Sequence, residues 1–373
     1  MNTDAVFRDI TEADYPLLPE FFYQTIPFEP GVELALPEVL DKPELSRYFQ
    51  DFGGKQDCGI VAEIQGRVVG MAWTRLIKAY GFVDDQTPEL VVSVLPEHQG
   101  KGIGTKLLER LFEVLTWHSF YRVSLSVNQS NQAVRLYRRL GFKVAKEDDE
   151  DFVMVKELAP ESMEDFFAAR VDIYDDHMLT EMELSRFYND IPNWIESSRR
   201  DLRLLDLGCG TGLELEGLFK KYPDMQATGI DLSPEMLTRL EEKYPDKALD
   251  LVCASYFDVD FGEAYDAVLS VYSLHHFTEA QKLGLYRKIH EALVPGGVFI
   301  NGDFTVTTPE LKDLFMSQSI RIRTEHGITD GEFFHIDTPL TVETELRLLK
   351  EAGFTSIRVL HQETHASVIV AGA

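Results

Sequence analysis

The sequence predicts an α/β protein of two domains, and three observations support this prediction. Its 373 residues are more than a single hydrophobic core usually supports. At about 150 residues per domain, this length suggests two domains. A glycine-rich loop that follows an apolar strand and opens a helix occurs twice, at residues 99–104 and 208–212. In the second half, strand-like and helix-like stretches alternate, as in a parallel sheet. We expect a mixed α+β domain at residues 1–158 and a doubly wound α/β domain at residues 159–373.

Composition narrows the class of protein. With 44% hydrophobic residues and no apolar run approaching the roughly 18 residues of a membrane helix, the chain is expected to be soluble, without a membrane partner. Residues 1–4 lack the basic start of a secretory signal, and three widely spaced cysteines argue against a disulfide framework or a zinc site. A cytoplasmic location is therefore expected.

The charge of the chain also excludes a class of partners. The formal net charge is −27, and no basic patch interrupts the acidic composition. Such a chain is a poor binder of nucleic acids. Small molecules, cationic ones among them, or a protein are the expected substrates.

The first elements of the N-terminal domain follow from short patterns. Residues 5–10 predict a strand, and Thr11 with its following acids predicts a helix cap. A second helix is predicted at residues 43–52. The stretches 60–64 and 67–73, joined by Gln65-Gly66, predict a β-hairpin.

The informative part of this domain begins with a strand predicted at residues 91–94. It runs into the glycine-punctuated loop 99–104 and then into a long amphipathic helix. Consecutive backbone N–H groups at such a helix start can bind a pyrophosphate. A further strand is predicted at residues 122–127, before the stretch 131–142.

Residues 99–104 and 131–142 resemble the GNAT acetyltransferase superfamily, and the resemblance extends over about residues 4–157. It implies acetyl-CoA as cofactor and Tyr137 as the group that protonates the departing thiolate. It also implies that the acetyl carbonyl hydrogen-bonds the strand near Val94. Tyr137 as a mere packing residue, and Lys101 as a solvated lysine, remain alternatives. The cofactor-binding residues implied are Val94, Gln99, Gly100, Gly102, Gly104, Thr105 and Asn131.

The acyl acceptor of this domain is not specified by any motif. An amine acceptor with a pKa of about 10.4 is mostly protonated at pH 7, a handicap of about 4.6 kcal/mol, so a general base is useful. Glu63, Glu97 and His98 are candidates, and no pattern selects one of them.

An acidic run and a proline mark the join between the domains. Residues 147–151 predict a solvated hairpin tip before a last strand at residues 152–156. Residues 158–161, which include Pro160, are the expected boundary.

The second glycine loop follows a strand that carries Asp206, and its glycines are Gly208, Gly210 and Gly212. Glycines there permit positive φ and let a ligand approach the main chain at a helix start. A second strand ends in Asp231, where a carboxylate can accept both hydroxyls of a ribose. The spacing departs from the dinucleotide pattern G-x-G-x-x-G, because Leu213 stands in place of the last glycine.

This combination resembles the class I S-adenosylmethionine-dependent methyltransferases. The resemblance implies a Rossmann-like sheet of seven strands with an antiparallel last strand. Asp206 is then expected near the amino-acid moiety of S-adenosylmethionine, Asp231 at its ribose, and Tyr174, from the helical lead-in 163–188, at its carboxylate. The acid that the family commonly offers to the adenine is replaced here. Ser255 and Tyr256 are expected to take its place, with lower affinity.

Further strands are predicted at residues 249–253, 264–271, 298–303, 356–360 and 367–371, with a turn at 293–297. His275 and His276 follow the fourth strand, at the edge where open α/β sheets bind ligands. Resemblance to small-molecule methyltransferases with the same Leu-His-His-Phe stretch implies a pocket histidine, and His276 is the catalytic candidate. No metal site is expected, because adjacent side chains usually diverge and no third ligand is evident. The insertion 304–348 is implied to form part of the acceptor pocket.

The sequence thus predicts a bifunctional group transferase. It joins an acetyl-CoA-dependent N-acyltransferase to an S-adenosylmethionine-dependent methyltransferase, both acting on small molecules, with amines among the candidates. The alternative is that one domain is a non-catalytic cofactor-binding or scaffolding module for the other. Neither the acceptors nor the oligomeric state follows from the sequence.

Overall fold

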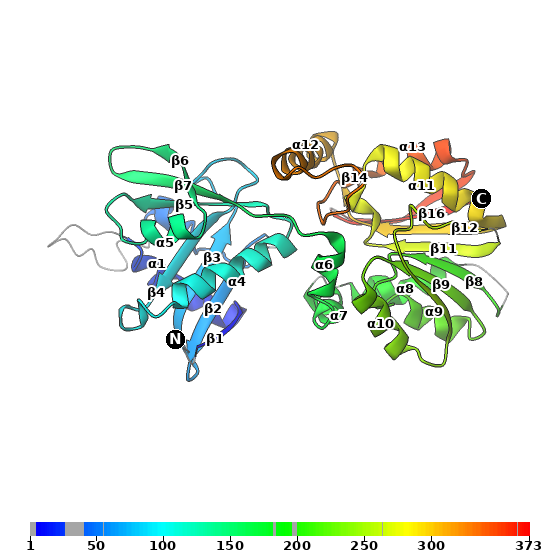
Figure 1. The fold of residues 1–373 in the computed structure, drawn as a ribbon, viewed down its shortest axis with the longest axis horizontal. Helices are drawn as coiled ribbons and strands as arrows, with labels where there is room; N and C mark the ends of the chain where they lie inside the picture. The colour runs from blue at the N-terminus through cyan, green and yellow to red at the C-terminus, as the bar shows by residue number, and fades with distance from the viewer. Residues whose placement is uncertain are drawn as a thin grey trace. The chain divides into compact units, whose positions relative to one another are not determined.

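A computed structural model describes residues 5–26, 41–54, 56–181, 184–195, 200–262, 264–363 and 365–373 (Figure 1). The chain divides into two compact units, Met1–Pro160 and Glu161–Ala373. Each unit contains its own seven-stranded sheet, and the two sheets differ in topology. The prediction of a mixed α/β protein is confirmed.

The sheet of the N-terminal unit has the order β1-β2-β3-β4-β5-β7-β6. All neighbours are antiparallel except β4 and β5, which are parallel. The strands are β1 (Val6–Asp9), β2 (Cys58–Ile64), β3 (Arg67–Arg75), β4 (Glu89–Val94), β5 (Arg122–Asn128), β6 (Lys143–Glu147) and β7 (Asp151–Glu157). The helices are η1 (Glu12–Leu17), α1 (Leu18–Tyr23), α3 (Pro43–Ser46), η2 (Pro96–His98), α4 (Ile103–Trp117) and α5 (Val134–Arg139).

The parallel pair β4 and β5 is joined at one point. Glu89 of β4 pairs with Ser124 of β5, and the described ladder between the two strands contains no further pair. Beyond that point the two strands separate, and the facing edge of β4 keeps backbone groups that can bond a ligand. The loop 99–102 and the start of α4 follow β4 directly.

The second predicted helix is shorter than expected. Residues 43–52 were expected to be helical, but α3 ends at Ser46. Side chains of β3 take the carbonyls that a longer helix would use. Nε1 of Trp73 donates to the Tyr48 carbonyl at 2.8 Å, and Nη1 of Arg75 donates to the Arg47 carbonyl at 2.9 Å.

The sheet of the C-terminal unit has the order β10-β9-β8-β11-β12-β16-β15. The first five are mutually parallel, and β16 is antiparallel to both neighbours, as predicted for the last strand. The strands are β8 (Arg203–Leu207), β9 (Gln226–Asp231), β10 (Ala248–Cys253), β11 (Tyr265–Val271), β12 (Leu293–Asp303), β15 (Ser356–Gln362) and β16 (Ser367–Gly372). A short pair, β13 (Thr305–Val306) and β14 (Leu340–Thr341), lies apart from this sheet.

Helices cover both faces of this sheet, because alternate residues of a buried parallel strand point to opposite sides. Leu204 packs in one core with Leu218 of α9, whereas Leu205 packs in the other with Leu285 of α11. The helical elements are α6 (Met163–Ala168), α7 (Tyr174–Asp176), the π-helical η3 (His177–Glu181), α8 (Ser185–Trp194), α9 (Leu215–Lys221), α10 (Pro234–Lys243), η4 (Leu274–His276), α11 (Glu279–Ala292), α12 (Pro309–His326) and α13 (Val342–Ala352).

The order of the sheet places a binding edge between β8 and β11. The chain leaves β8 toward β9 on one side and β11 toward β12 on the other, so the strand order reverses there. Ligands of open α/β sheets bind outside the carboxyl ends of the strands at such a point. The turn expected at residues 293–297 is instead the start of β12, where its pairing with β11 shifts register.

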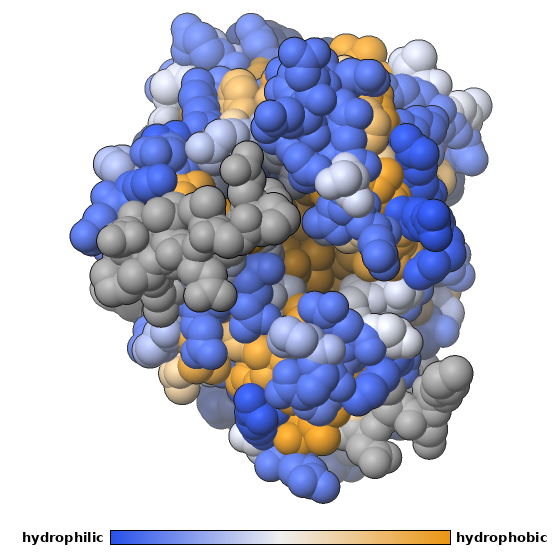
Figure 2. Space-filling model, turned by 90° about the vertical axis from the view of Figure 1, so that its left-hand side faces the viewer, coloured by the Kyte–Doolittle hydropathy of each residue, from blue (hydrophilic) through white to orange (hydrophobic). Residues whose placement is uncertain are grey.

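Apolar residues are limited in extent, both along the described helices and on the face of the molecule shown in Figure 2. Among the described helices, none has both the length and the apolar character that crossing a bilayer requires. Figure 2 shows one face of the molecule, on which hydrophilic side chains predominate and hydrophobic ones appear in several smaller patches.

Candidate functional site

The glycine loop of the C-terminal unit bends sharply after β8. Gly208, Gly210 and Gly212 have φ values of +74°, +47° and +73°, a region that residues with a Cβ rarely adopt. A Cβ on Gly208 would stand 2.2 Å from Oγ of Ser273. The close packing of Ser273 and the positive φ together explain why glycine stands at this position of the loop.

Asp231 ends β9 and fixes the loop. Its Oδ2 accepts a hydrogen bond from the Gly210 N–H at 2.9 Å, and its Oδ1 accepts one from the Ser233 N–H at 2.9 Å. Burial raises the pKa of the Asp231 carboxyl, although these N–H donors oppose the rise. Each carboxylate oxygen keeps a lone pair for a further donor, such as a ribose hydroxyl.

Asp206 and Glu214 form a buried acidic pair at the two ends of the loop. Their side chains are buried and hydrogen-bond each other, and within the described residues no other group donates to Asp206 or to Oε1 of Glu214. Burial raises the pKa of Glu214 to about 7. Burial, followed by the charge of Glu214, raises the pKa of Asp206 well above its usual value. Buried carboxyls without other donors are groups that a cationic ligand can satisfy.

A narrow cavity opens at the carboxyl ends of β8, β9 and β11. Its walls combine the glycine loop with aromatic rings and sulfur-containing side chains. The lining residues are Met163, Phe167, Tyr174, Gly208, Gly210, Asp231, Leu232, Met236, Tyr256, Val271, Tyr272, Ser273 and His276.

Five of the cofactor residues predicted for this unit line the cavity: Tyr174, Gly208, Gly210, Asp231 and Tyr256. The catalytic candidate His276 lines it too. Asp206 and Gly212 belong to the same loop but do not form its walls. Ser255, expected at the adenine, also lies outside the lining, and its Oγ accepts a hydrogen bond from the Phe257 N–H at 3.3 Å.

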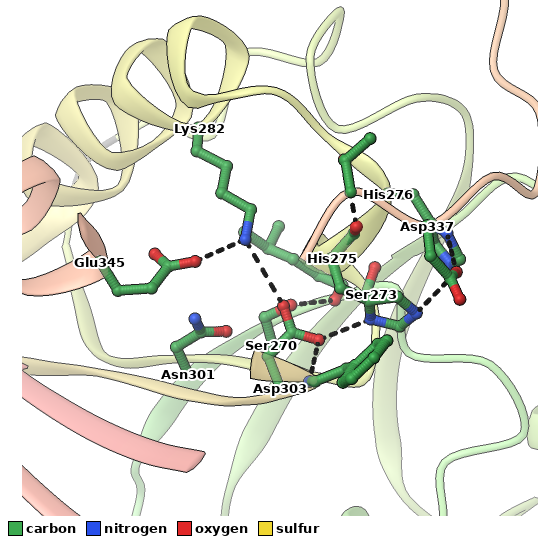
Figure 3. Close-up of polar contacts among 12 residues, drawn as sticks. Ser270, Ser273, His275, His276, Lys282, Asn301, Asp303, Asp337 and Glu345 are labelled. Atoms are coloured by element: carbon green, nitrogen blue, oxygen red, sulfur yellow. Dashed lines mark hydrogen bonds and ion pairs between the residues drawn. The ribbon is translucent and has the colours of Figure 1, made fainter. Parts of the chain in front are cut away.

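The histidine pair lies in η4, directly after β11 (Figure 3). His275 Nδ1 is 2.7 Å from Asp303 Oδ1, and His276 Nδ1 is 3.2 Å from Asp337 Oδ1. The two ring centroids are 3.9 Å apart, so the expectation that these adjacent side chains diverge is wrong. The physical reason is that carboxylates from distant segments lie against both rings. Asp337 is also the third potential ligand that the sequence did not reveal.

The two histidines differ in proton affinity. Burial lowers the pKa of His275, but the charge and hydrogen bond of Asp303 outweigh burial and raise it. Burial, followed by the neighbouring His275, lowers the pKa of His276. Burial opposes ionisation of Asp337, yet its hydrogen bond from His276 and the histidine charges hold its pKa below the usual range. His276 is therefore the histidine better suited to accept a proton near pH 7.

Sequence reasoning missed three acidic residues of this site: Glu214, Asp303 and Asp337. Asp303 had a usable signal, because it ends a parallel strand just as Asp231 does. Asp337 had none, since it lies in the insertion 304–348, far in sequence from every motif. That insertion does reach the site, where the His335 ring lies 4.7 Å from that of His276.

The predicted loop of the N-terminal unit lies between η2 and α4. Gly100 and Gly102 have φ values of +71° and +87°, and a Cβ on either would meet no atom within 4 Å. Gln99 Nε2 donates to the Val94 carbonyl at 2.9 Å, which ties the loop to β4. Lys101 Nζ donates to the Glu97 carbonyl at 2.7 Å. The loop is thus open to a ligand on its glycine side.

The remaining predicted residues of this unit surround the start of α4. Gly104 and Thr105 lie in its first turn, and Thr105 Oγ1 is 3.5 Å from Nη2 of Arg139 on α5. Asn131 Oδ1 accepts from the Ala133 N–H at 2.8 Å just before α5. Burial raises the pKa of Tyr137 to about 12, so its hydroxyl stays protonated.

The three candidate bases of this unit differ in their contacts. Glu63 accepts a hydrogen bond from Arg8 at 2.9 Å, which commits it to a structural ion pair. Glu97 is exposed, with Arg67 at 3.6 Å. His98 has a buried Nδ1 without a hydrogen-bond partner among the described residues. Of the three, His98 alone has a buried ring nitrogen free to accept a proton.

Comparison with known proteins adds two family matches in different units of the chain. A family model for the methyltransferase domain matches residues 204–297, and one for the acetyltransferase (GNAT) family matches residues 22–142. The carboxy-S-adenosyl-L-methionine synthase of Trichodesmium erythraeum is 30% identical over 172 residues, which are 42% of this chain and 67% of that protein. The malonyl-[acyl-carrier protein] O-methyltransferase of Acetivibrio thermocellus is 23% identical over 169 residues, 45% of this chain and 58% of that protein. The structure of DesVI from Streptomyces venezuelae aligns with a TM-score of 0.41 and 20% identity, covering 54% of this chain and 97% of that chain.

Proposed function

Because this chain belongs, through its C-terminal unit, to the S-adenosylmethionine-dependent methyltransferases, we propose that this unit methylates a small-molecule acceptor. We further propose that the N-terminal unit is an acetyl-CoA-dependent N-acyltransferase, which makes the chain bifunctional. Amines are the acceptors that this second proposal favours.

The cavity beside the glycine loop supports the methyl-transfer proposal. S-adenosylmethionine, when bound, supplies a methyl group on a cationic sulfur. Asp231 offers free lone pairs at the loop, and Asp206 with Glu214 offers a buried pair of hydrogen-bonded carboxyls. Three carboxyl groups around one glycine loop suit a ligand that carries an ammonium, a sulfonium and two ribose hydroxyls. The residues present therefore fit this cofactor.

The chain's own contribution to methyl transfer is orientation and proton acceptance. The aromatic and methionine walls of the cavity, such as Phe167, Met236 and Tyr272, exclude water and hold the acceptor in place. His276 lines the same cavity and has a lowered pKa, so it can accept a proton from the acceptor at neutral pH.

The diverging strands β4 and β5 support the acyl-transfer proposal. The glycine loop 99–102 opens toward a ligand at the start of α4, where free N–H groups and the helix dipole favour a pyrophosphate. Acetyl-CoA, when bound, supplies an acetyl thioester. Transfer to an amine would break its acetyl–sulfur bond and form an acetyl–nitrogen bond, and the amine would lose a proton to a base, for which His98 is a candidate. Tyr137 keeps its proton at neutral pH and can give it to the departing sulfur.

Untargeted profiling of a metabolite extract with labelled donors tests both halves of the proposal. The full chain should move label from methyl-labelled S-adenosylmethionine and from acetyl-labelled CoA into separate or shared products. Tyr137→Phe should lower acetyl turnover without lowering methyl turnover, and His276→Gln should do the reverse. If only one label ever appears in a product while both cofactors bind, the silent unit is a cofactor-binding module and bifunctionality is refuted.

A further inference from the structure

The residues around η4 carry an excess of buried negative charge (Figure 3). Glu345 is compensated, because Lys282 Nζ lies 2.5 Å from its Oε1 and the Tyr286 hydroxyl donates to its Oε2. Asp303 has that ammonium only at 3.9 Å, and Asp337 has no lysine or arginine partner among the described ion pairs. Asp303 and Asp337 are therefore two buried carboxylates without a close lysine or arginine among the described residues, and a divalent cation would compensate their charge.

Three ligand atoms of this cluster converge on one point. They belong to His275, His276 and Asp337, and all lie within 4.8 Å of one another. His275 Nε2 is 3.7 Å and His276 Nδ1 is 3.2 Å from Asp337 Oδ1. Ligands on one ion with bonds of about 2.1 Å stand roughly 3.0–3.5 Å apart in octahedral or tetrahedral geometry. A small inward movement of the rings would complete such a set.

The surroundings of these atoms match those of known metal ligands. His275 uses Nδ1 toward Asp303 at 2.7 Å, which directs Nε2 toward Asp337. Metal-binding histidines characteristically give their second nitrogen to a carboxylate in this way. His276 Nδ1 and Asp337 Oδ1 are buried and lie 3.2 Å apart, with no other hydrogen-bond partner given for either atom within the described residues. A metal ion between them would replace this one contact.

We propose that His275 Nε2, His276 Nδ1 and Asp337 Oδ1 bind one divalent transition-metal ion of the first row, with Asp303 as a positioning residue for His275. Two histidines and one carboxylate leave coordination positions open. Because His276 lines the cofactor cavity, these positions face the acceptor end of that cavity. An acceptor that presents an oxygen to the ion is therefore the expected class, and this last step rests on the proposed methyl transfer.

Cobalt binding to the full chain tests the metal site directly. Protein stripped with a chelator is titrated with Co²⁺, whose visible absorption reports nitrogen ligands and coordination number. One ion per chain is expected, with a d–d band that Zn²⁺ abolishes by displacement. The chain's 63 acidic residues can bind Co²⁺ weakly elsewhere, but such sites give no histidine-dependent band.

Variants distinguish the two ligand residues Asp337 and His276 from the positioning residue Asp303. Asp337→Asn and His276→Gln should each weaken Co²⁺ binding at least a hundredfold. Asp303→Asn should weaken it by about 10–100-fold and shift the band, since it acts through the orientation of His275. His290→Ala is the matched control, because this histidine packs on Phe354, outside the cluster, and should leave titration and band unchanged. Circular dichroism of each variant confirms that it is folded.

The outcomes distinguish this inference from the proposed function. A wild-type chain without the band, or folded Asp337→Asn and His276→Gln variants that bind as the wild type does, would overturn the metal site while S-adenosylmethionine binding persists. Loss of cofactor binding with an intact cobalt site would instead overturn the methyl-transfer proposal. Acetohydroxamate, a bidentate oxygen ligand, should shift the cobalt band. An unchanged band would refute the open positions.

Discussion

At the scale of single residues, the carboxylates of the C-terminal glycine loop have different tasks. Asp231 is bonded to two backbone N–H groups and organises the loop, whereas Asp206 and Glu214 have no such donors for three of their oxygens. Removing one of these acids should therefore affect binding in different ways.

Asp231→Ala should weaken S-adenosylmethionine binding by about one to two orders of magnitude. It removes charge-assisted acceptors that contribute roughly 1.5–3 kcal/mol each, and water compensates part of that loss. Asp231→Asn keeps one oxygen acceptor and should lose less. Calorimetric titration measures both. Asp224→Asn, which alters an exposed ion pair with Arg200, is the control and should bind as the wild type does.

The affinity for S-adenosylmethionine should rise with pH between about 6 and 8. The carboxyl pair of Asp206 and Glu214 has raised pKa values, about 7 for Glu214, so the empty site holds a proton below that pH. A cationic ligand favours the ionised pair and expels this proton, so binding strengthens as pH rises through 7.

Calorimetry in two buffers of different ionisation enthalpy should detect this released proton. Glu214→Gln should reduce both the release and the pH slope, because only Asp206 then remains to titrate. The exposed Glu216, paired with Lys220 at 2.5 Å, provides the control Glu216→Gln, which should keep both. A wild-type affinity that is flat across this pH range would contradict the prediction.

At the scale of elements, both units contain a strand–glycine loop–helix motif, but the two loops are packed differently. In the C-terminal unit the loop is crowded, since a Cβ on Gly208 would collide with Ser273. In the N-terminal unit Gly100 and Gly102 face open space, so a larger side chain there meets the ligand rather than the protein.

Gly102→Asp should weaken acetyl-CoA binding at least tenfold, or about 1.4 kcal/mol. It places a negative charge where the pyrophosphate is expected. Gly66→Asp is a matched control in the hairpin between β2 and β3, because Gly66 has a φ of +76° and equally open space. Both variants should lose similar stability on thermal unfolding, but only Gly102→Asp should lose binding. Equal binding by the two would remove the loop from the acetyl-CoA site.

At the scale of the whole molecule, the chain consists of two units that each own a sheet and a core. One hydrophobic cluster lies wholly within Met1–Pro160, and two others lie wholly within Glu161–Ala373. Each unit therefore has enough hydrophobic core of its own that we expect it to fold independently.

Fragments 1–160 and 161–373 should therefore each unfold cooperatively. The second should bind S-adenosylmethionine with the affinity of the full chain, and the first should do the same for acetyl-CoA. Thermal unfolding monitored by circular dichroism, together with calorimetric titration, measures these properties. A fragment that binds its cofactor only when the other is added would show that the sites depend on both units.

The sequence by itself determined the parts of this protein that depend on local stereochemistry. Glycines at alternate positions after an apolar strand specify a loop with positive φ, and the sequence pattern alone pointed to Gly208, Gly210 and the acid Asp231, which line one cavity. The alternation of strands and helices likewise specified the parallel sheet and its antiparallel β16. Both the local steric preferences and the period of the hydrophobic pattern depend only on residues within or next to each element.

Only the tertiary structure decided which side chains meet across long separations. Asp337 reaches His276 from the insertion after β12, and Asp303 fixes His275 from the end of β12. Helix α3 is short because the Trp73 and Arg75 side chains of β3 bond the backbone carbonyls just beyond its end. Such contacts depend on how distant segments fold over the sheet, and they are stabilised by burial and by charge interactions between different elements. No short stretch of sequence specifies these interactions. The histidine and carboxylate cluster could therefore be identified only from the tertiary structure.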